Sequence, residues 1–560
     1  MLNAALDAPI KPAMQDLAHQ YDVAILGSGL SGSMLACILA KQGASVVLIE
    51  EGTHPRFAIG ESTIPHTSLL TLLLAQKYGV PELENIAYPE RIAEKVCSTC
   101  GIKRAFGFVF HRSGEAHNAR EGHQLGTSAK DENHYFRQDI DAYLFHTALH
   151  YGVVGKQKTK ITDLTIDKEG VVMRTAAGDG IRCRYVVDGT GHESLLAARF
   201  NLREHPSPIK HHSRTIFTHM IDVPPFQEDS NPLSISWHQG TLHHVFARGW
   251  FWVIPFNNHE RSTNPLISVG LTIDPRRYPK RAISPEQEFK QFLGMFPSVA
   301  EQFEDAKAVR PWVSTGRLQY SSKHCAGYRY CLMSHAAGFI DPLFSRGMIN
   351  TMEVIAALVD PLLEALTGND FDEAPFARVN DVQQRALKYN DSLVNGAFIA
   401  WSDFDLWNAW LRVWALGTVP TQFRMMNALA DYTEKRDSSC LRGETMDPVF
   451  SDFEDSDYRA FLEGVMPLVE GFEAGTVTAT DAAEQIFTMA KAYPFPIPIR
   501  ADALARAGWL KGTDQISERD AKFARHGFRW ALSDPGTRDL CATIGNLFRW
   551  RAHSPDPHLV

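Results

Sequence analysis

The chain has 560 residues, enough for about two to four packed units. Its 44% hydrophobic and 22% charged residues are ordinary for a globular protein. The net charge of −9 disfavours non-specific binding to nucleic acid. The 23 histidines and 8 cysteines form no spacing typical of a metal site, so we expect no metal.

The N-terminal region and the cysteines bear on location. Residues 1–20 mix Asp, Lys and Pro with apolar residues and form no signal-peptide core. Residues 23–40 are apolar enough to imitate a membrane span, but their glycines favour a buried strand, turn and helix. Only Cys97 and Cys100 form a Cys-x-x-Cys pair, and we expect reduced thiols. A cytoplasmic protein without a membrane span is predicted.

The first expected unit alternates strands and helices. Residues 21–26 predict a strand, 27–32 a turn, 33–42 a helix and 44–49 the next strand. Further on, the patterns predict helices at 68–78 and 137–151 and strands at 106–111 and 184–187. This order is typical of an α/β nucleotide-binding module.

A Gly-x-Gly-x-x-Gly run occupies residues 27–32 of this unit. It follows a strand, opens a helix and is followed by Glu50 at the end of the next strand, which is the context a dinucleotide site requires. The glycines would let the backbone approach a pyrophosphate at the helix N-terminus, and Glu50 would accept from ribose hydroxyls. The alternative is a glycine-rich turn without a ligand.

The pattern changes in residues 213–315. Segments 216–221 and 266–272 alternate or are β-branched, which predicts a mostly antiparallel sheet that forms a substrate domain. Residues 330–333 return to strand character, and 350–366 predict a helix that packs back on the first unit. The nucleotide-binding module is therefore expected to be discontinuous in sequence.

Helical patterns dominate from about residue 385. Phe404, Trp407, Leu411 and Trp414 fall on one helical face, either as a core stripe or as a lid over an aromatic substrate. The predicted divisions are an N-terminal tail at 1–20, an FAD-binding module at 21–212 that returns at 321–385, a substrate-domain sheet at 213–320 and a helical C-terminal domain at 386–560.

Residues Gly249–Pro255 read Gly-Trp-Phe-Trp-Val-Ile-Pro. Trp and Ile suit a strand that Pro ends, so a buried aromatic strand accounts for the segment by itself. The Trp-x-Trp-x-Ile-Pro run also resembles the signature of flavin-dependent halogenases. Further segments resemble the same family across about residues 21–370: 60–65 (Gly-Glu-Ser-Thr-Ile-Pro), 101–108, 188–191 and 339–347.

The resemblance implies an α/β fold with a Rossmann-like FAD-binding domain of the flavin monooxygenase type. It also implies that reduced FAD, O₂ and chloride or bromide generate hypohalous acid, which halogenates an electron-rich aromatic. Lys103 is in register with the family's essential lysine; its ammonium would polarise hypohalous acid, or its amine would form a chloramine. The alternative for Lys103 is an exposed surface lysine.

The resemblance assigns further roles. Backbone N–H groups of Arg346 and Gly347 would hold the halide, and Trp250 and Trp252 would wall the flavin from the substrate. The predicted catalytic residues are Lys103, Ser345, Trp250 and Trp252. The predicted cofactor-binding residues are Gly27, Gly29, Leu30, Ser31, Gly32, Glu50, Glu51, Arg56, Glu61, Ser62, Arg137, Asp188, His335 and Asp341.

Two departures from the family pattern are informative. The late Gly-Asp-Ala-Ala motif begins here with Ser334-His335, and His335 replaces an Asp that usually hydrogen-bonds the flavin ribityl chain. Phe344 takes the position where tryptophan halogenases carry a Glu. A Phe there resembles the phenol and pyrrole branch, and the chain looks most like halogenases of tyrosyl-type units in polyketide or nonribosomal peptide pathways. Substrates in that branch are often tethered to carrier proteins.

No nicotinamide site is evident, so a separate NAD(P)H-dependent flavin reductase is implied. Three alternatives remain open. An aromatic hydroxylase would carry an Asp-Gly pair where this chain has Thr190-Gly191. A flavin-dependent double-bond reductase would not need Lys103 or the paired tryptophans. A catalytically silent flavin-binding partner of a biosynthetic assembly line is the third.

Overall fold

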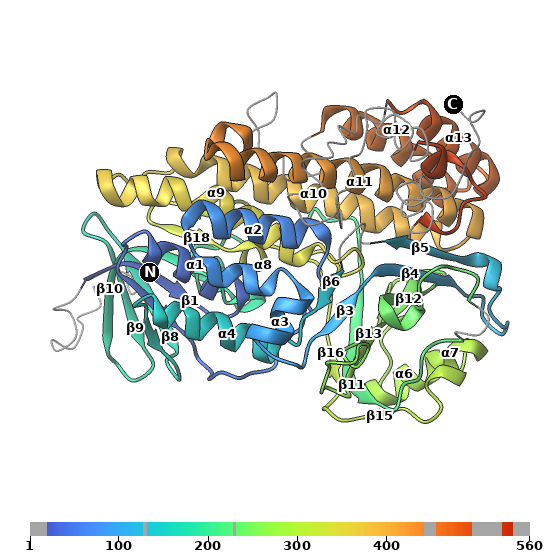
Figure 1. Ribbon diagram of the computed structural model, residues 1–560, viewed down its shortest axis with the longest axis horizontal. Helices are drawn as coiled ribbons and strands as arrows, with labels where there is room; N and C mark the ends of the chain where they lie inside the picture. The colour runs from blue at the N-terminus through green and yellow to red at the C-terminus, as the bar shows by residue number, and fades with distance from the viewer. Residues whose placement is uncertain (1–19, 127–130, 228–230, 442–454, 495–528, 541–560) are drawn as a thin grey trace, which may run out of the picture.

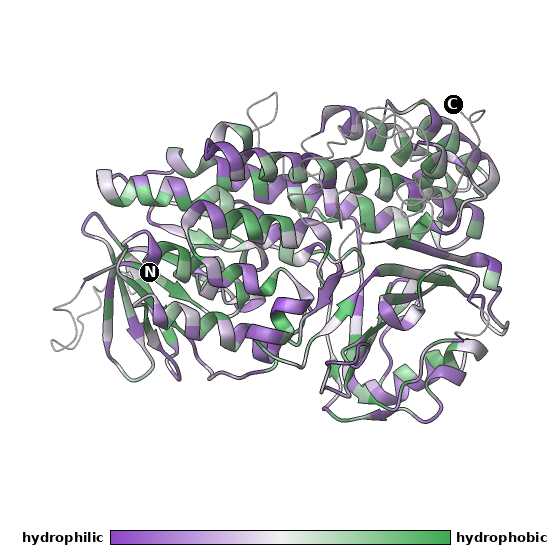
Figure 2. Cartoon of the chain, in the orientation of Figure 1, coloured by the Kyte–Doolittle hydropathy of each residue, from purple (hydrophilic) through white to green (hydrophobic). Residues whose placement is uncertain are grey.

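Two eight-stranded sheets, one small two-stranded sheet and a layer of long helices form the part of the chain that the structure describes (Figure 1). The structure is a computed structural model, and it describes residues 20–126, 131–227, 231–441, 455–494 and 529–540. Hydrophobic residues run along the strands and along the helix faces that cover them (Figure 2).

The first sheet is built around strand β1 (Gln20–Leu26). β1 lies between β10 (Gly180–Asp188) and β2 (Val46–Ile49), and both pairs are parallel. Helix α1 (Leu30–Lys41) follows β1 and packs against α4 (Arg137–His150). Covered strands of this kind are apolar along their whole length, as 23–26 are. The predicted Rossmann-like α/β fold is confirmed.

The rest of this sheet extends in both directions. Its order is β17-β18-β10-β1-β2-β7, and β9 joins β10 to β8. The bounds of the added strands are Ala326–Gly327 (β17), Tyr330–Leu332 (β18), Val154–Lys156 (β7), Ile161–Ile166 (β8) and Val171–Thr175 (β9). Because β9 pairs with its first half, β10 is longer than the predicted strand 184–187. β18 pairs in parallel with β10, so segments far apart in the sequence share this sheet.

Two helices beside this sheet also begin earlier than predicted. Helix α1 starts at Leu30, inside the predicted turn, because Gly29 is its N-cap and the following residues form its first turn. Helix α9 (Gly347–Gly368) encloses the predicted helix 350–366. α9 packs against α1 and against α2 (Pro65–Tyr78), so it covers the first sheet as expected.

The second sheet has the order β15-β11-β14-β13-β12-β4-β5, with β16 also paired to β11. Every pair is antiparallel except β12 with β4. β4 and β5 fall inside 21–212, so that range supplies strands to both large sheets. The bounds are Lys307–Ala308 (β15), Arg214–Ile221 (β11), Ile267–Ile273 (β14), Gly249–Pro255 (β13), Thr241–Phe246 (β12), Ala105–Phe110 (β4), Gly122–Gly126 (β5) and Val313–Ser314 (β16).

Strand β13 carries the tryptophan signature, and its two faces belong to different cores. Trp250 and Trp252 join the large core shared with the first sheet. Phe251 points the other way, where its ring meets Phe289 of helix α6 (Pro285–Leu293) at 5.6 Å. The interpretation of this segment as a buried aromatic strand is therefore confirmed.

Four long helices follow the two sheets. Phe404, Trp407, Leu411 and Trp414 are all buried, so the predicted core stripe is confirmed. None of the helices in the described ranges is long and apolar enough to cross a membrane. The helices are α10 (Ala377–Ala400), α11 (Phe404–Lys435), α12 (Ser456–Glu473) and α13 (Ala479–Ala492).

The contact between Trp252 and Gly270 of β14 gives a first prediction. A Cβ on Gly270 would lie 2.2 Å from Cη2 of Trp252. Gly270→Ala is therefore expected to displace Trp252 and to lower the free energy of unfolding by about 1–3 kcal/mol. The measurement is the thermal midpoint Tm. In the control Gly294→Ala the new Cβ meets nothing closer than 3.6 Å, so an equal fall in Tm there would contradict this prediction.

Candidate functional site

Two glycines of the turn after β1 leave no room for a side chain. Gly27 has φ +86°, and a Cβ there would lie 2.8 Å from the carbonyl oxygen of Gly189. A Cβ on Gly32 would lie 2.0 Å from the carbonyl oxygen of Gly27. Leu30 and Ser31 form the first turn of α1, so the N-terminus of a 12-residue helix follows this turn. Such an N-terminus suits a pyrophosphate.

Glu50 follows the last residue of β2, and its carboxylate binds the glycine-rich turn. Its Oε2 accepts hydrogen bonds from the Ser28 N–H at 3.0 Å and from Arg56 Nη2 at 3.1 Å. Burial favours the protonated carboxyl, but the Arg56 charge and the N–H groups of Gly52 and Ser28 outweigh it and lower the Glu50 pKa. Glu51 lies apart: its side chain is 65% exposed and pairs with Lys160.

The two predicted aspartates, Asp188 and Asp341, both accept hydrogen bonds from hydroxyl groups. Asp188, at the end of β10, accepts hydrogen bonds from the Thr190 hydroxyl at 2.6 Å and the Ser194 hydroxyl at 2.7 Å. Asp341 accepts one from the Ser213 hydroxyl at 2.7 Å. Both carboxylates are buried, so they hold the loops that line the site in shape.

The loop at residues 60–65 is clamped from two sides. Arg137 forms a two-point ion pair with Asp141 and donates to the carbonyl oxygen of Gly60 at 3.0 Å. Glu61 is buried, and its Oε1 hydrogen-bonds Nε2 of His219 at 2.8 Å. The loop therefore has a fixed shape between the two large sheets.

Lys103 is the centre of the site. It ends strand β3 (Gly101–Lys103) and has no exposed surface. Its Nζ donates to the Ser62 hydroxyl at 2.8 Å and to the Thr63 carbonyl oxygen at 2.9 Å. The Ser345 hydroxyl lies 3.1 Å from the same Ser62 oxygen. The structure thus brings three predicted residues together, and the alternative of an exposed surface lysine is wrong.

Glu132 is a residue that the sequence analysis missed. It lies directly opposite Lys103 in the antiparallel pair of β3 and β6 (Glu132–His134). Its buried carboxylate accepts from the hydroxyls of Thr63 at 2.8 Å and Ser68 at 2.6 Å. Burial holds the pKa of Lys103 well below its usual range, and the Glu132 charge opposes that shift. No local signal marks Glu132, because only strand pairing brings it to the lysine.

His335 lies next to the loop that carries Ser345. A Cβ on Gly347 would lie 2.9 Å from the His335 Nε2, which has no hydrogen-bond partner in the described structure. Burial, together with the Arg137 charge, lowers the His335 pKa to about 4, so the ring is neutral near pH 7. Ser345 adopts φ +53°, which turns the loop into α9.

A row of aromatic rings extends from Phe106 to Phe217. His243 lies 5.8 Å from Phe106 and 5.2 Å from Trp250, measured between ring centroids. Trp250 lies 5.7 Å from Trp252, and Trp252 lies 6.1 Å from Phe217. The paired tryptophans are thus inside a continuous buried layer, which is compatible with the predicted wall.

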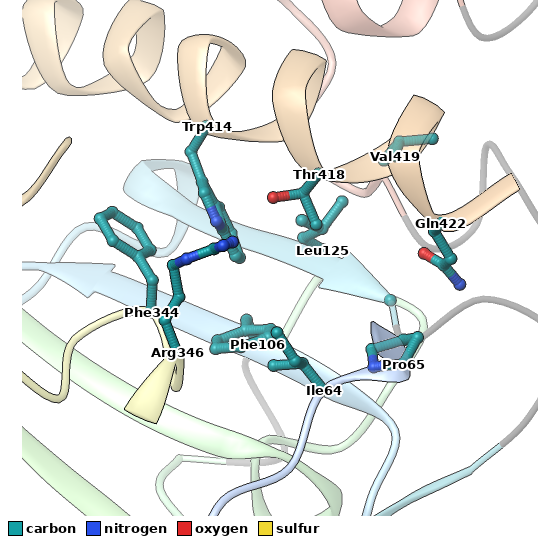
Figure 3. Close-up of a pocket in the computed structure, with 11 residues that line it drawn as sticks. Ile64, Pro65, Phe106, Leu125, Phe344, Arg346, Trp414, Thr418, Val419 and Gln422 are labelled. Carbon is teal, nitrogen blue, oxygen red and sulfur yellow. The ribbon is translucent and has the colours of Figure 1, made fainter. Parts of the chain in front are cut away.

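A pocket lies on one side of this row, between α11 and β4. In Figure 3, Trp414 and Thr418 descend from α11 toward Phe106 and Ile64. Trp414 therefore belongs to the core stripe and also lines a pocket. The lining residues are Ile64, Pro65, Phe106, Leu125, Gly126, Phe344, Arg346, Trp414, Thr418, Val419 and Gln422.

Within the described ranges, three buried polar atoms of the predicted cofactor site find no hydrogen-bond partner: Nε of Arg56, Oε2 of Glu61 and Nε2 of His335. Nε1 of the predicted catalytic residue Trp250 finds none there either. Unpaired buried polar groups are costly, so they mark places where a ligand completes the structure. Together with the glycine turn, they fit the phosphates, ribose and polar ring edge of FAD. The described residues contain no group of three His, Cys, Asp or Glu that could hold a metal.

The Cys97 and Cys100 thiols lie in the loop before β3. Their sulfur atoms are 3.6 Å apart, and both thiols are free. The hydrogen bond with Cys100 lowers the Cys97 pKa to about 7, although burial opposes this.

Comparison with known proteins identifies the class. Residues 20–281 match the FAD binding domain family model. The chain is 46% identical over 496 residues to monodechloroaminopyrrolnitrin halogenase PrnC of Pseudomonas fluorescens, covering 87% of this chain and 88% of that protein. It is 44% identical to the tetracycline 7-halogenase of Kitasatospora aureofaciens, covering 83% and 85%.

A solved structure agrees with these matches. The crystal structure of halogenase PltM in complex with phloroglucinol and FAD superposes with a TM-score of 0.81 at 30% identity, covering 85% of this chain and 96% of that chain. The fold and the site thus define an FAD-dependent enzyme. Within that class, the chain belongs to the flavin-dependent halogenases, as its sequence motifs predict.

The glycine turn generates a prediction about FAD. Gly32→Ala would place a Cβ against the Gly27 carbonyl and displace the helix N-terminus. We expect FAD affinity to fall at least about 10-fold, equivalent to about 1.4 kcal/mol. Flavin fluorescence titration measures this. Gly316→Ala, where a Cβ meets nothing within 4 Å, is the control, and tight FAD binding by Gly32→Ala would contradict the prediction.

The Glu132–Lys103 pair generates a prediction about pH. Burial lowers the Lys103 pKa and Glu132 raises it, so Glu132→Gln removes the opposing effect and lowers the pKa further. The limb of the pH–rate profile for halogenation that reports Lys103 is expected to move toward lower pH. Glu286→Gln, at a half-exposed ion pair on α6, is the control. An unchanged profile in Glu132→Gln would show that the carboxylate does not act on Lys103.

Proposed function

We propose that Lys103 delivers an electrophilic halogen to an electron-rich aromatic ring held in the pocket beside α11. The observation that carries this proposal is the complete burial of Lys103 within hydrogen-bond distance of Ser62, on the loop whose Ile64 and Pro65 line the pocket. One short loop thus contacts both the amine and the pocket.

Bound FAD in its reduced form supplies hypohalous acid from O₂ and a halide ion. The residues of this chain then act on that acid. The Lys103 ammonium polarises the O–X bond, or its neutral amine takes the halogen and releases water; the lowered pKa favours the neutral amine. The halogen then forms a bond to a ring carbon, and the ring loses a proton. The Ser345 hydroxyl orients Ser62, the hydrogen-bond partner of the lysine.

We assign the roles of the halide-binding residues and of the paired tryptophans from their positions in the structure. The backbone N–H groups of Arg346 and Gly347 hold the halide where the loop enters α9, near the unpartnered nitrogen of His335. Trp250 and Trp252 keep the substrate away from the flavin, because both rings are buried and rigidly packed. Substrate therefore reacts at the lysine end of the aromatic row.

The side chains that line the pocket suit a flat aromatic substrate. Phe106, Phe344 and Trp414 provide ring faces, and the Arg346 side chain reaches the pocket from below Trp414 (Figure 3). The relatives are named for monodechloroaminopyrrolnitrin and tetracycline, and the PltM structure contains phloroglucinol. We therefore favour an electron-rich phenolic or pyrrolic ring.

The partners of the reaction are also proposals. A separate NAD(P)H-dependent reductase supplies reduced FAD. The relatives with 46% and 44% identity are named for small molecules, whereas the chlorinase named for a pyrrolyl group on a peptidyl carrier protein is 25% identical over 66% of this chain. A small aromatic molecule is therefore favoured over a carrier-bound one.

Lys103→Met tests the proposal, since methionine keeps the bulk of the side chain without its amine. The full chain is incubated with FAD, a flavin reductase, NADH, O₂, bromide or chloride and phloroglucinol as the probe. Halogenated product, identified by its isotope doublet, is expected to fall at least about 100-fold. FAD binding and flavin oxidation are expected to stay unchanged, because the amine does not hold the cofactor.

The matched control is Lys95→Met, at an exposed position at the end of α3 (Pro89–Lys95). It should halogenate the probe like the parent protein. Normal product from Lys103→Met would overturn the proposed role of the lysine. A product that gains one oxygen instead of a halogen would favour hydroxylation.

A further inference from the structure

The ring of Phe106 covers the amine of Lys103. Nζ of Lys103 lies 3.3 Å from the centroid of that ring. Phe106 also lines the pocket beside α11, whereas Lys103 does not. The ring therefore lies between the proposed catalytic amine and the space proposed for the substrate, and an aromatic substrate in the pocket cannot touch the amine in this arrangement.

The other contacts of Phe106 show what holds the ring in place. Trp414 of α11 meets it edge-on at 4.9 Å, and the rings of His243 and Phe108 stack against it at 5.8 Å and 6.3 Å. The lysine amine packs against the face of the ring. The remaining side of the ring borders the pocket beside α11, so this is the side toward which the ring would turn.

We propose that Phe106 is a gate residue that closes Lys103 off from the substrate pocket and turns aside when the halogen is transferred. The inference rests on the proposed role of Lys103 and adds Phe106 as a residue that controls access to its amine. Trp414 contacts Phe106 and lines the pocket, so a substrate that packs against Trp414 also contacts the gate. Substrate binding and exposure of the amine are thereby coupled.

The gate gives the enzyme a chemical advantage. A neutral amine is a nucleophile, and burial favours the neutral form of Lys103. While the ring covers the amine, reactive molecules that enter the pocket do not reach it. The halogen is therefore kept from pocket contents until an aromatic ring displaces Phe106.

Amine labelling tests the gate without any turnover. The full chain with FAD bound is reductively methylated with formaldehyde and dimethylamine borane, and peptide mass spectrometry follows Lys103. Lys103 should be protected in the parent protein and be methylated at least about tenfold faster in Phe106→Ala. Phe110→Ala is the control, because Phe110 lies on the same strand but its ring meets Phe404 and does not cover the amine. It should label Lys103 like the parent.

Equal labelling in the parent and Phe106→Ala, or in both alanine variants, would overturn the gate. If Phe106→Ala fails to bind FAD, Phe106→Leu takes its place. A bulkier gate supplies the second readout: Phe106→Trp should lower halogenation of phloroglucinol at least about tenfold with FAD binding unchanged. Unaltered halogenation would contradict movement of the ring. If the parent protein halogenates nothing, the proposed function fails, while the labelling result still decides whether Phe106 covers Lys103.

Discussion

The site depends on the burial of one amine. Lys103 is removed from water, and an unpaired buried charge is costly. Three kinds of group compensate for this burial. They are two oxygen acceptors on the 60–65 loop, the ring face of Phe106 and the carboxylate of Glu132 on the opposite strand. Each compensating group comes from a different element, so the lysine requires the loop, both small strands and the second sheet to be in place together.

This requirement explains the arrangement of the two sheets. The loop that receives the lysine is fixed by Arg137 on the cofactor side and by His219 on the second sheet. The row of rings from Phe106 through the tryptophans lies on neighbouring strands of the second sheet. In the proposed mechanism, this layer of rings separates the cofactor from the substrate.

Much of this was readable from the sequence. The glycine turn with Glu50 predicted the dinucleotide site, because strand, turn, helix and acid stand in one short segment. The strand at Gly249–Pro255 and the helix inside Gly347–Gly368 were found from local patterns. The element boundaries were less accurate: β10 is extended by its pairing with β9, which no local pattern reports. For the same reason the placement of β4 and β5 in the second sheet was not foreseen.

The sequence by itself determined the family, the cofactor and the position of the lysine, since contiguous motifs carry that information. Only the tertiary structure decided what surrounds the lysine. Glu132 and Trp414 reach the site through strand pairing and helix packing with segments far apart in the chain. Phe106 is only three residues from Lys103, and the folding of β4 after β3 places its ring over the amine. The physical reason is that burial and the electrostatic environment of an amine are properties of the packed structure, whereas a turn or an amphipathic helix is a property of neighbouring residues.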